Sequence, residues 1–400
     1  MAPPVGWVSC LSFLFQRLAN VIFSQNEQLK NDKPNHNIMK LSLYILSVSL
    51  ALAAANSDKQ SRRLGAPAVD PKKVDADERR TRELDHNDGC YNTKEELKRD
   101  INLYLNDPVA RQQMRPIGEW CVSKITDFSS LFTGRAAPGF NEPLAGWDTS
   151  NAENMQGMFE RAAEFNKDIG MWNTAKCTNM EAMFRGATKF NQDLFWETSQ
   201  VTNFGLMFNQ AVSFNGEVST FDTSSATRMR MMFYKASKFD GDISNWVTSA
   251  VTDMFWMFNE ATSFNKPLNN WDVRKVTDMS RMFRKASAFN QPLNKWVIDS
   301  VTNTRFMFQS AVSFDQDLTS WDISGVNDIR GMFLSAERFN VNMCKWAEPI
   351  FANNVRVDYS VFAGTACDSW YESSNNGGSY QNLCEKTCQI SDIISKIYSL

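Results

Sequence analysis

The chain has 400 residues, of which 43% are hydrophobic, so it can bury a large core and is not disordered as a whole. Its net charge of −3 argues against general nucleic-acid binding, which usually needs a basic surface. Both histidines, His36 and His86, precede the repeated region described below, which excludes histidine triads and histidine metal sites from most of the chain. We expect no cofactor, no metal site and no nucleic-acid partner.

Residues 39–55, MKLSLYILSVSLALAAA, have the layout of a secretory signal peptide, with one lysine, an apolar run and small residues before a cleavage site. The apolar run is shorter than the about 20 residues that span a bilayer comfortably. We therefore expect Met39 to be the true start, residues 1–38 to be a non-native extension, and the mature chain to carry no stable transmembrane span. The alternative is a membrane-anchoring signal segment behind a short leading tail.

Residues 56–88 consist almost entirely of charged and small side chains. Such a stretch buries too little apolar surface to offset the entropy lost on ordering, so we expect a disordered linker. An N-terminal cap over residues 89–122 then precedes the repeats of residues 123–366. A cysteine-containing C-terminal cap and tail over residues 367–400 follows them.

Six of the eight cysteines flank the repeats, which is the pattern expected for disulfides that staple the ends of a secreted repeat protein. They are Cys90, Cys121, Cys344, Cys367, Cys384 and Cys388. We expect Cys90 to pair with Cys121 and favour a pair between Cys344 and Cys367. Cys177 lies inside a repeat, where other repeats carry Val or Ala, so we expect a buried free thiol.

The repeated region returns to the same residue types every 25 residues, with one interval of 24. Strict self-similarity at such a period is typical of a solenoid, in which each unit buries its apolar face against its neighbours. Each unit has a Phe-Asn or Phe-Asp step, and the phenylalanines are Phe140, Phe165, Phe190, Phe214, Phe239, Phe264, Phe289, Phe314 and Phe339. The tryptophan column is Trp147, Trp172, Trp196, Trp246, Trp271, Trp296, Trp321 and Trp346, with Phe221 in the one gap.

The unit at residues 264–289 combines two periodicities. Trp271 and Val273 are two apart and would lie on the same face of a short strand. Thr277 and Asp278 suit the first turn of a helix. The helical stripe that follows is Val276, Met279, Met282, Phe283 and Ala286. We therefore expect an α/β solenoid of stacked strand–helix coils.

The motif F-N-x-P/D-L-x-x-W-D-x-S-x-V-T-x-M-x-x-M-F-x-x-A resembles the repeats of the BspA-like leucine-rich-repeat surface proteins. Within it, Leu268-x-x-Trp271-x-Val273 follows the leucine-rich-repeat frame with tryptophan at one leucine position. The resemblance covers residues 123–366. It implies a leucine-rich-repeat-like solenoid at a cell surface, often linked to adhesion or binding, and it supplies no catalytic residue.

Two columns of polar or aromatic residues have alternative explanations. The tryptophans could stack sugars, but their strand phase matches the inward leucines, which favours core packing. The residue after each repeat phenylalanine could bind ions, but pairing with backbone groups at the turn is the better explanation. That Asn/Asp column is Asn141, Asn166, Asn191, Asn215, Asp240, Asn265, Asn290, Asp315 and Asn340.

The strand face is the first candidate binding surface. The residue after each tryptophan is mostly acidic or polar and would form a polar strip if this face is concave. A merely solvated strand face is the alternative. The strand-face candidates are Asp148, Asn173, Glu197, Asp222, Asp272 and Asp322.

The helix face is the second candidate. The residue before each Met-Phe pair falls off the core stripe, and in the central units it is large and apolar or basic, which predicts an exposed patch. An anionic glycan or an acidic protein could dock there, whereas lateral packing between helices is the alternative. The helix-face candidates are Arg230, Trp256, Arg281, Arg305, Phe306 and Arg330.

These features lead us to expect a secreted or cell-surface binding or adhesion protein, non-catalytic, whose partner is an extracellular protein or glycan. One alternative is a carbohydrate-active enzyme that uses strand-face carboxylates. Against it, the acidic positions simply recur with the repeat, and no unit has a distinctive carboxylate pair. The other alternative is a self-assembling component of a cell covering.

Overall fold

The computed structural model describes residues 89–366, except residues 135–138, 347–348, 351–352, 354 and 358–359. The chain divides into two units, Met1–Thr81 and Arg82–Leu400, and the described residues all belong to the second. The expected extension, signal peptide, linker and C-terminal tail lie outside the described residues.

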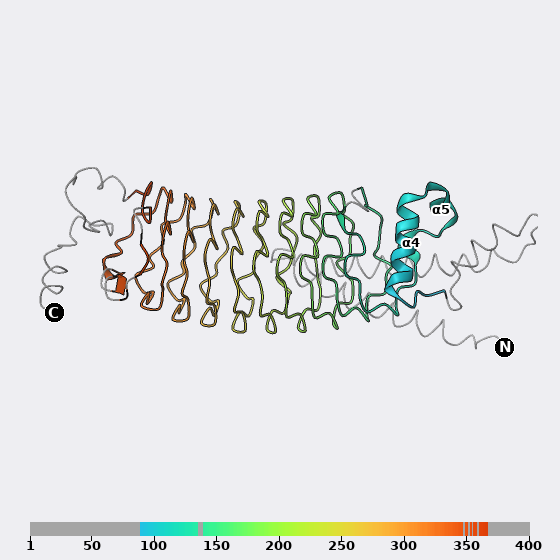
Figure 1. The fold of residues 1–400 in the computed structure, drawn as a ribbon, viewed down its shortest axis with the longest axis horizontal. Coiled ribbons are helices and arrows are strands. Elements are labelled where there is room, and N and C mark those ends of the chain that lie inside the picture. The colour runs from blue at the N-terminus through green and yellow to red at the C-terminus, as the bar shows by residue number, and fades with distance from the viewer. Residues whose placement is uncertain are drawn as a thin grey trace, which may run out of the picture. The chain divides into compact units, whose positions relative to one another are not determined.

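Two α-helices precede the repeats, α4 (Lys94–Asn106) and α5 (Pro108–Gln113), followed by the 3-10 helix η1 (Ile117–Glu119) (Figure 1). Helix α4 begins with a capping box. The Thr93 hydroxyl accepts a hydrogen bond from the Glu96 N–H, and the Glu96 carboxylate accepts one from the Thr93 N–H. A second 3-10 helix, η3 (Cys344–Trp346), lies near the end of the repeats.

The buried face of α4 joins the helices to the repeat core. Leu97 and Ile101 have no exposed surface, and Tyr104 lies edge-on to Trp120 with ring centroids 5.6 Å apart. Because these side chains pack into one continuous apolar cluster with the repeats, the helices cover apolar surface that the first coil would otherwise expose.

The predicted disulfide between Cys90 and Cys121 is confirmed, with the two Cα atoms 4.4 Å apart. Cys177 is a buried free thiol, as predicted, and burial raises the pKa of this thiol to about 11. Cys367, Cys384 and Cys388 lie outside the described residues, as does the side chain of Cys344.

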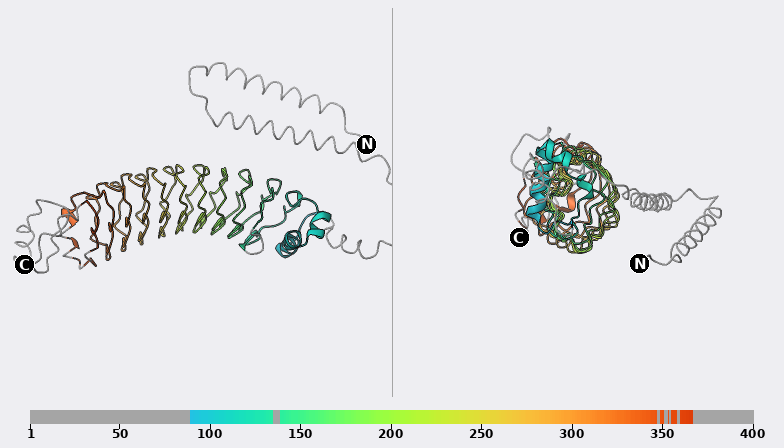
Figure 2. Two further views of the ribbon diagram at one scale, coloured as in Figure 1. Left: turned by 90° about the horizontal axis from the view of Figure 1, so that it is seen from above. Right: turned by 90° about the vertical axis from the view of Figure 1, so that its right-hand side faces the viewer.

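Each repeat forms one coil, and the coils lie one behind the other (Figure 1). In the end-on view they superpose (Figure 2). A parallel β-bridge joins one residue of each coil to the equivalent residue of the next, so the coils are in register. The bridge residues are Asp127, Asn154, Asn179, Asn203, Arg228, Asp253, Asp278, Asn303, Asp328 and Arg356.

The predicted strand and helix of each coil are wrong, because residues 139–343 contain only turns and single bridges. Two residues per coil have a left-handed backbone, such as Arg281 with φ 55° and Lys285 with φ 57°, and a right-handed helix cannot continue through them. Alternate N–H groups instead donate to the next coil, as Arg281 does to the Arg305 carbonyl at 2.9 Å. Apolar residues at helical spacing are also buried by such a series of turns, so periodicity could not distinguish the two.

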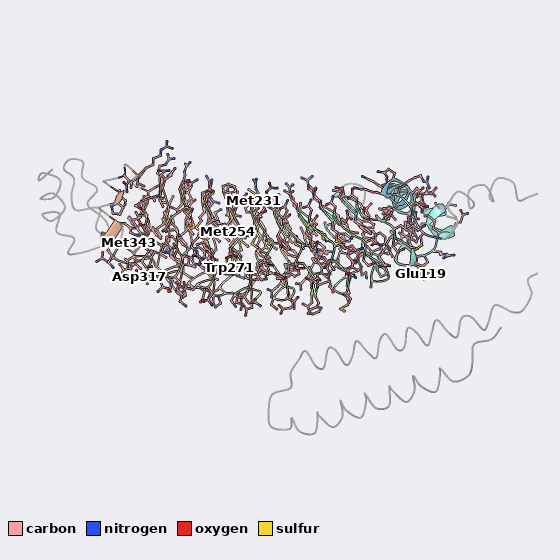
Figure 3. The ribbon with its side chains drawn as sticks, turned by 90° about the horizontal axis from the view of Figure 1, so that it is seen from below. Glu119, Met231, Met254, Trp271, Asp317 and Met343 are labelled. Carbon is pink, nitrogen blue, oxygen red and sulfur yellow. A yellow bond between two sulfur atoms is a disulfide. The ribbon has the colours of Figure 1, made fainter. Side chains whose placement is uncertain are left out.

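Side chains fill the stack of coils along its length (Figure 3), and the core contains ring columns that run from coil to coil. Phe258 and Phe283 stack with centroids 5.6 Å apart, and Trp246 and Trp271 with centroids 6.4 Å apart. The Trp271 indole N–H donates to the Ile243 carbonyl at 3.1 Å in the preceding coil. The tryptophans are therefore core residues, as predicted.

The Asn/Asp column satisfies backbone groups, also as predicted. The Asp240 Oδ1 atom accepts from the Asn265 N–H at 2.9 Å, and the Asn265 Oδ1 atom accepts from the Asn290 N–H at 2.9 Å. The same bond recurs between successive members of the column from Asn141 to Asn340. Each side chain thus fixes the turn of the following coil.

Candidate functional site

The strand-face candidates are surface residues whose side chains hold turns. Asp222 Oδ1 accepts from the Ser224 N–H at 2.9 Å, and Asp272 Oδ1 accepts from the Arg274 N–H at 3.1 Å. The same bond to the N–H two residues further on is made by Asp148, Asn173, Glu197 and Asp322. The backbone of this position is also bonded, since the Thr248 hydroxyl donates to the Asp272 carbonyl at 2.9 Å.

These hydrogen bonds lower the pKa of the strand-face aspartates. The Ser224 N–H and hydroxyl lower the pKa of Asp222, and the Arg274 side chain lowers that of Asp272. The pKa values of Asp148 and Asp322 are lowered by serines in the same way. A general acid for glycoside hydrolysis needs the opposite shift.

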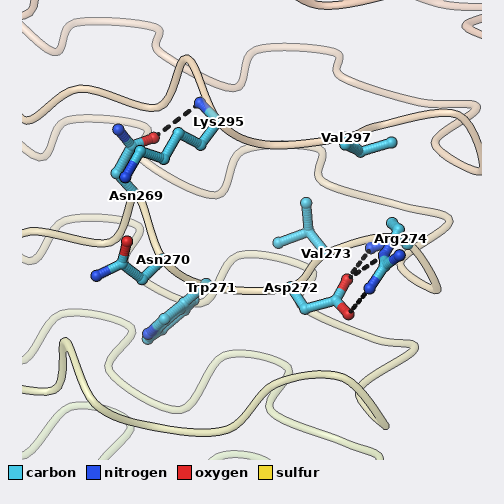
Figure 4. Close-up of a pocket in the computed structure, with 8 residues that line it drawn as sticks. All are labelled: Asn269, Asn270, Trp271, Asp272, Val273, Arg274, Lys295 and Val297. Carbon is cyan, nitrogen blue, oxygen red and sulfur yellow. Dashed lines mark hydrogen bonds and ion pairs between the residues drawn. The ribbon is translucent and has the colours of Figure 1, made fainter.

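A pocket of about 320 Å³ opens on the strand face beside Asp272 (Figure 4). Its lining residues are Asn269, Asn270, Trp271, Asp272, Val273, Arg274, Lys295 and Val297. The Asp272 carboxylate is held by a bidentate contact with Arg274, whose Nε and Nη2 atoms lie 2.9 Å and 2.6 Å from its oxygens. The pocket lining therefore has one carboxylate, already paired, and no acid–base couple.

The helix-face candidates lie partly in a column that we call the left-handed column, made up of the residue before each Met-Phe pair. All eight members have a positive φ, from 53° to 61°. They are Gly157, Ala182, Leu206, Met231, Trp256, Arg281, Phe306 and Gly331. A side chain costs roughly 1 kcal/mol at such a position, where glycine is favoured. The backbone conformation therefore does not explain the large side chains at this position in the central coils.

Four of the six helix-face candidates come together in what we call the arginine stack, made up of Trp256, Arg281, Arg305 and Phe306. The Arg281 Cζ atom lies 5.1 Å from the ring centroid of Trp256 and 5.1 Å from that of Phe306. The Arg305 Cζ atom lies 4.7 Å from the Phe306 centroid. Because these distances are within cation–π range, each guanidinium is held against at least one ring.

Gly331 ends the stack in the next coil. A Cβ atom built on Gly331 would lie 2.3 Å from the Phe306 ring, so this ring occupies the space that a side chain would need. Trp256 has a further aromatic neighbour on the preceding coil, Tyr234, with centroids 5.5 Å apart. The rings on both sides therefore restrict the position of Arg281.

The other two candidates lie beside carboxylates. Arg230 Nε is 4.0 Å from Asp253, and its Cζ atom is 6.0 Å from the Phe255 centroid. Arg330 makes a bidentate contact with Asp328 at 3.0 Å and 2.6 Å. Their charges are thus partly neutralised within the coil.

Arg281 and Arg305 have no ion pair with a carboxylate in the part of the chain that the structure describes. Partial burial, and then the nearby Arg305 and Arg284, lower the pKa of Arg281, although an arginine remains protonated at neutral pH. The Arg305 Nε and Trp256 Nε1 atoms are buried without a hydrogen-bond partner, which costs about 1–3 kcal/mol per group. The stack therefore holds more positive charge than its surroundings neutralise.

A protein-family model described as "Mycoplasma protein of unknown function, DUF285" matches residues 105–195, 194–296 and 266–366. The chain belongs to this family. The tandem matches identify a repeat protein, and the left-handed column runs through the DUF285 repeats. No curated protein and no solved structure matches the chain.

Sequence reasoning placed Arg284 and Lys285 beside the helix-face patch of the DUF285 repeats, but it missed Glu260 and Asn259. Glu260 lies 3.4 Å from Arg284, 3.6 Å from Lys285 and 3.9 Å from Lys235, so one carboxylate serves three cations. Asn259 is fully buried, and neither amide atom has a hydrogen-bond partner. Aligning the repeats at the position after each Met-Phe pair would have placed Asn259 and Arg284 in one column.

Within the described residues, no three His, Cys, Asp or Glu side chains lie close enough together to hold a metal ion. The helices in the same part of the chain are too short or too polar to cross a membrane.

Proposed function

We propose that this DUF285 protein is a secreted or cell-surface binding or adhesion protein that is not catalytic. Its coils would form a leucine-rich-repeat-like solenoid of the BspA-like type, with a side that meets an extracellular protein or glycan. Repeats that bury their aromatic rings in register, as Phe258 and Phe283 do, support this architecture.

The arginine stack carries the proposal. The fold does not need Arg281 at a left-handed position, where glycine is better suited. No carboxylate in the described residues forms an ion pair with it, and Asp278 acts on it only as a nearby charge. A side chain that costs stability and remains partly exposed is more readily explained by a ligand than by the fold.

Two observations support an extracellular location. The disulfide between Cys90 and Cys121 is typical of an oxidising compartment. Residues 39–55 have the layout of a signal peptide.

The carbohydrate-active alternative has less support. The lowered pKa values of Asp222 and Asp272 suit acceptors that hold turns, and the pocket beside Asp272 has a single paired carboxylate. For this reason we place the binding surface on the left-handed column rather than on the strand face.

A screen of the full-length chain, with its disulfides intact, against arrays of glycans and extracellular proteins tests the proposal. We expect a specific partner whose binding is weakened by R281Q/R305Q and is unchanged by D222N/D272N. If no partner binds at low or high salt, the proposed function is wrong. Filaments or sheets of the purified chain would then favour the self-assembling alternative.

A further inference from the structure

We propose that the arginine stack and the basic residues around it bind a linear anionic polysaccharide through its sulfate or carboxylate groups. This inference rests on the proposed binding function and specifies its ligand. It follows from the charge along the coils, the way the guanidinium groups are held, and the positions of the exposed apolar side chains.

Positive charge is concentrated in five consecutive coils. The charge lies at five positions per coil, namely the bridge residue and the second, third, sixth and seventh residues after it. In the coils that begin at Arg228 to Asp328, these positions hold eight basic and four acidic residues, whereas the three preceding coils hold two of each. The basic residues are Arg228, Arg230, Lys235, Arg281, Arg284, Lys285, Arg305 and Arg330. The acidic residues are Asp253, Glu260, Asp278 and Asp328.

The four carboxylates of these coils are engaged locally. Asp253 accepts from the Phe255 N–H at 3.1 Å, and Asp278 accepts from the Ser280 N–H at 2.7 Å. Asp328 pairs with Arg330, and Glu260 with its three cations. None of the four forms an ion pair with Arg281 or Arg305, so an outside anion would pair with these two cations.

The stack presents guanidinium edges rather than ring faces. The Trp256 and Phe306 rings cover the two sides of Arg281, so its N–H groups are left for a ligand. A planar row of donors matches the paired oxygens of a sulfate or carboxylate. Because the rings already restrict the side chain, less rotamer entropy is lost on binding. An uncharged sugar would find these ring faces occupied.

The register of the coils favours a linear polymer. Equivalent positions in neighbouring coils of a parallel stack are ~4.8 Å apart, so the five coils form a track roughly 20 Å long. Four of these coils have basic residues at the five positions, and the coil of Asp253 has none. A small anion would use one coil, whereas a chain with repeated charges meets several. Many contacts along one line would also make binding salt-dependent.

A protein partner fits this track less well. Stable protein interfaces have an apolar centre, which needs exposed apolar side chains. In the described residues, the large exposed hydrophobic side chains lie away from these five positions. They are Val109, Met171, Phe195, Val212, Val247 and Val297. Charge with apolar side chains that are at most partly exposed suits a polysaccharide.

The test measures binding of the full-length chain to heparin, a linear polysaccharide with sulfate and carboxylate groups, at about 0.15 M salt, where charges are screened beyond about 8 Å. We expect R281Q and R305Q each to weaken binding about tenfold, and the double variant about a hundredfold, because each removes a charge-assisted hydrogen bond. R281K should fall between the wild type and R281Q, because lysine keeps the charge but loses the planar fork.

Two matched controls remove the same charge elsewhere. R274Q affects a strand-face arginine already paired with Asp272, and R161Q affects a charge-balanced coil. Both should bind heparin within about twofold of the wild type, since exposed ion pairs contribute little. Thermal unfolding of every variant shows whether the fold is retained. If R281Q/R305Q unfolds, R281K and the salt dependence of wild-type binding decide the question.

Four outcomes would overturn the inference. Heparin binding that is unchanged in R281Q/R305Q places the ligand elsewhere. Tighter binding to poly-glutamate than to heparin, with the same loss in the variants, identifies an acidic protein segment as the ligand. Heparin binding that is insensitive to salt contradicts the charge argument. If the chain binds a partner on the arrays but does not bind heparin, the proposed function stands and only this inference is wrong.

Discussion

The strand-face column and the left-handed column both recur from coil to coil, but their side chains make different contacts. Asp222 and Asp272 accept hydrogen bonds from the N–H groups two residues further along the chain, and contacts with these residues lower their pKa values. Arg281 occupies a backbone conformation that favours glycine and contacts side chains of neighbouring coils. A column of acidic residues can therefore be structural, whereas an irregular column is the better indicator of a ligand.

The comparison predicts that changes around the strand-face column reduce stability and leave binding intact. The largest loss of stability is expected from a change in the core residue directly before Asp272. Trp271→Ala removes a buried ring that stacks on Trp246 and should lower the free energy of unfolding by about 3–5 kcal/mol. Urea denaturation of the full-length chain measures this. A loss below about 1 kcal/mol would mean that the ring column contributes little.

Gly331→Ala sharpens the comparison at the end of the arginine stack. The new Cβ atom would meet the Phe306 ring at 2.3 Å, at a residue with φ 59°. We expect a loss of about 2 kcal/mol from overpacking and backbone strain, together with weaker ligand binding because Phe306 is displaced. Gly157→Ala is the matched control, since the atom nearest to its new methyl group would be a Glu160 oxygen at 3.4 Å. Equal effects of the two changes would contradict this account of Phe306.

Asp222→Ala tests the structural role of the strand-face column. It removes the bond to the Ser224 N–H and should cost about 1 kcal/mol, with ligand binding unchanged. Thermal unfolding and the heparin assay measure the two effects separately. Weaker binding without a loss of stability would reverse the assignment of the two columns.

The same bonds predict an acid-dependent loss of stability. The pKa of Asp222 is lower in the folded chain than in the unfolded chain, so its contribution is complete above the unfolded value and is lost as pH falls toward the folded value. The pKa values of Asp148 and Asp322 are also lowered in the folded chain, so these residues contribute to the same loss of stability at low pH. Unfolding measured from pH 7 down to about pH 2 should show this decline, and D222N should reduce its steepness.

The smallest effect is expected where the left-handed column carries a residue with no role in the stack. Ala182 has φ 55°, and Ala182→Gly should raise the stability by about 0.5–1 kcal/mol because glycine tolerates this conformation. Arg281→Gly is the variant to compare with it. It should relieve the same backbone strain but also weaken ligand binding. A destabilised Ala182→Gly variant would show that the left-handed backbone is not strained.

The sequence alone determined which residues are buried, because each 25-residue unit needs its neighbour to cover the same rings. It also identified the Cys90–Cys121 pair, the buried Cys177 and the turn-forming Asn/Asp column. Burial follows from apolar spacing and turn chemistry, both of which are local and recur with the repeat.

Only the tertiary structure decided the backbone and the arrangement of the candidate site. The bonding partner of the Arg281 N–H is the Arg305 carbonyl, 24 residues away, so no local pattern could replace the expected helix with turns. Arginine has no preference for a left-handed backbone, and nothing near it in sequence reveals the two rings around it. Charge, conformation and ring contacts meet at Arg281 only because successive coils are stacked in register.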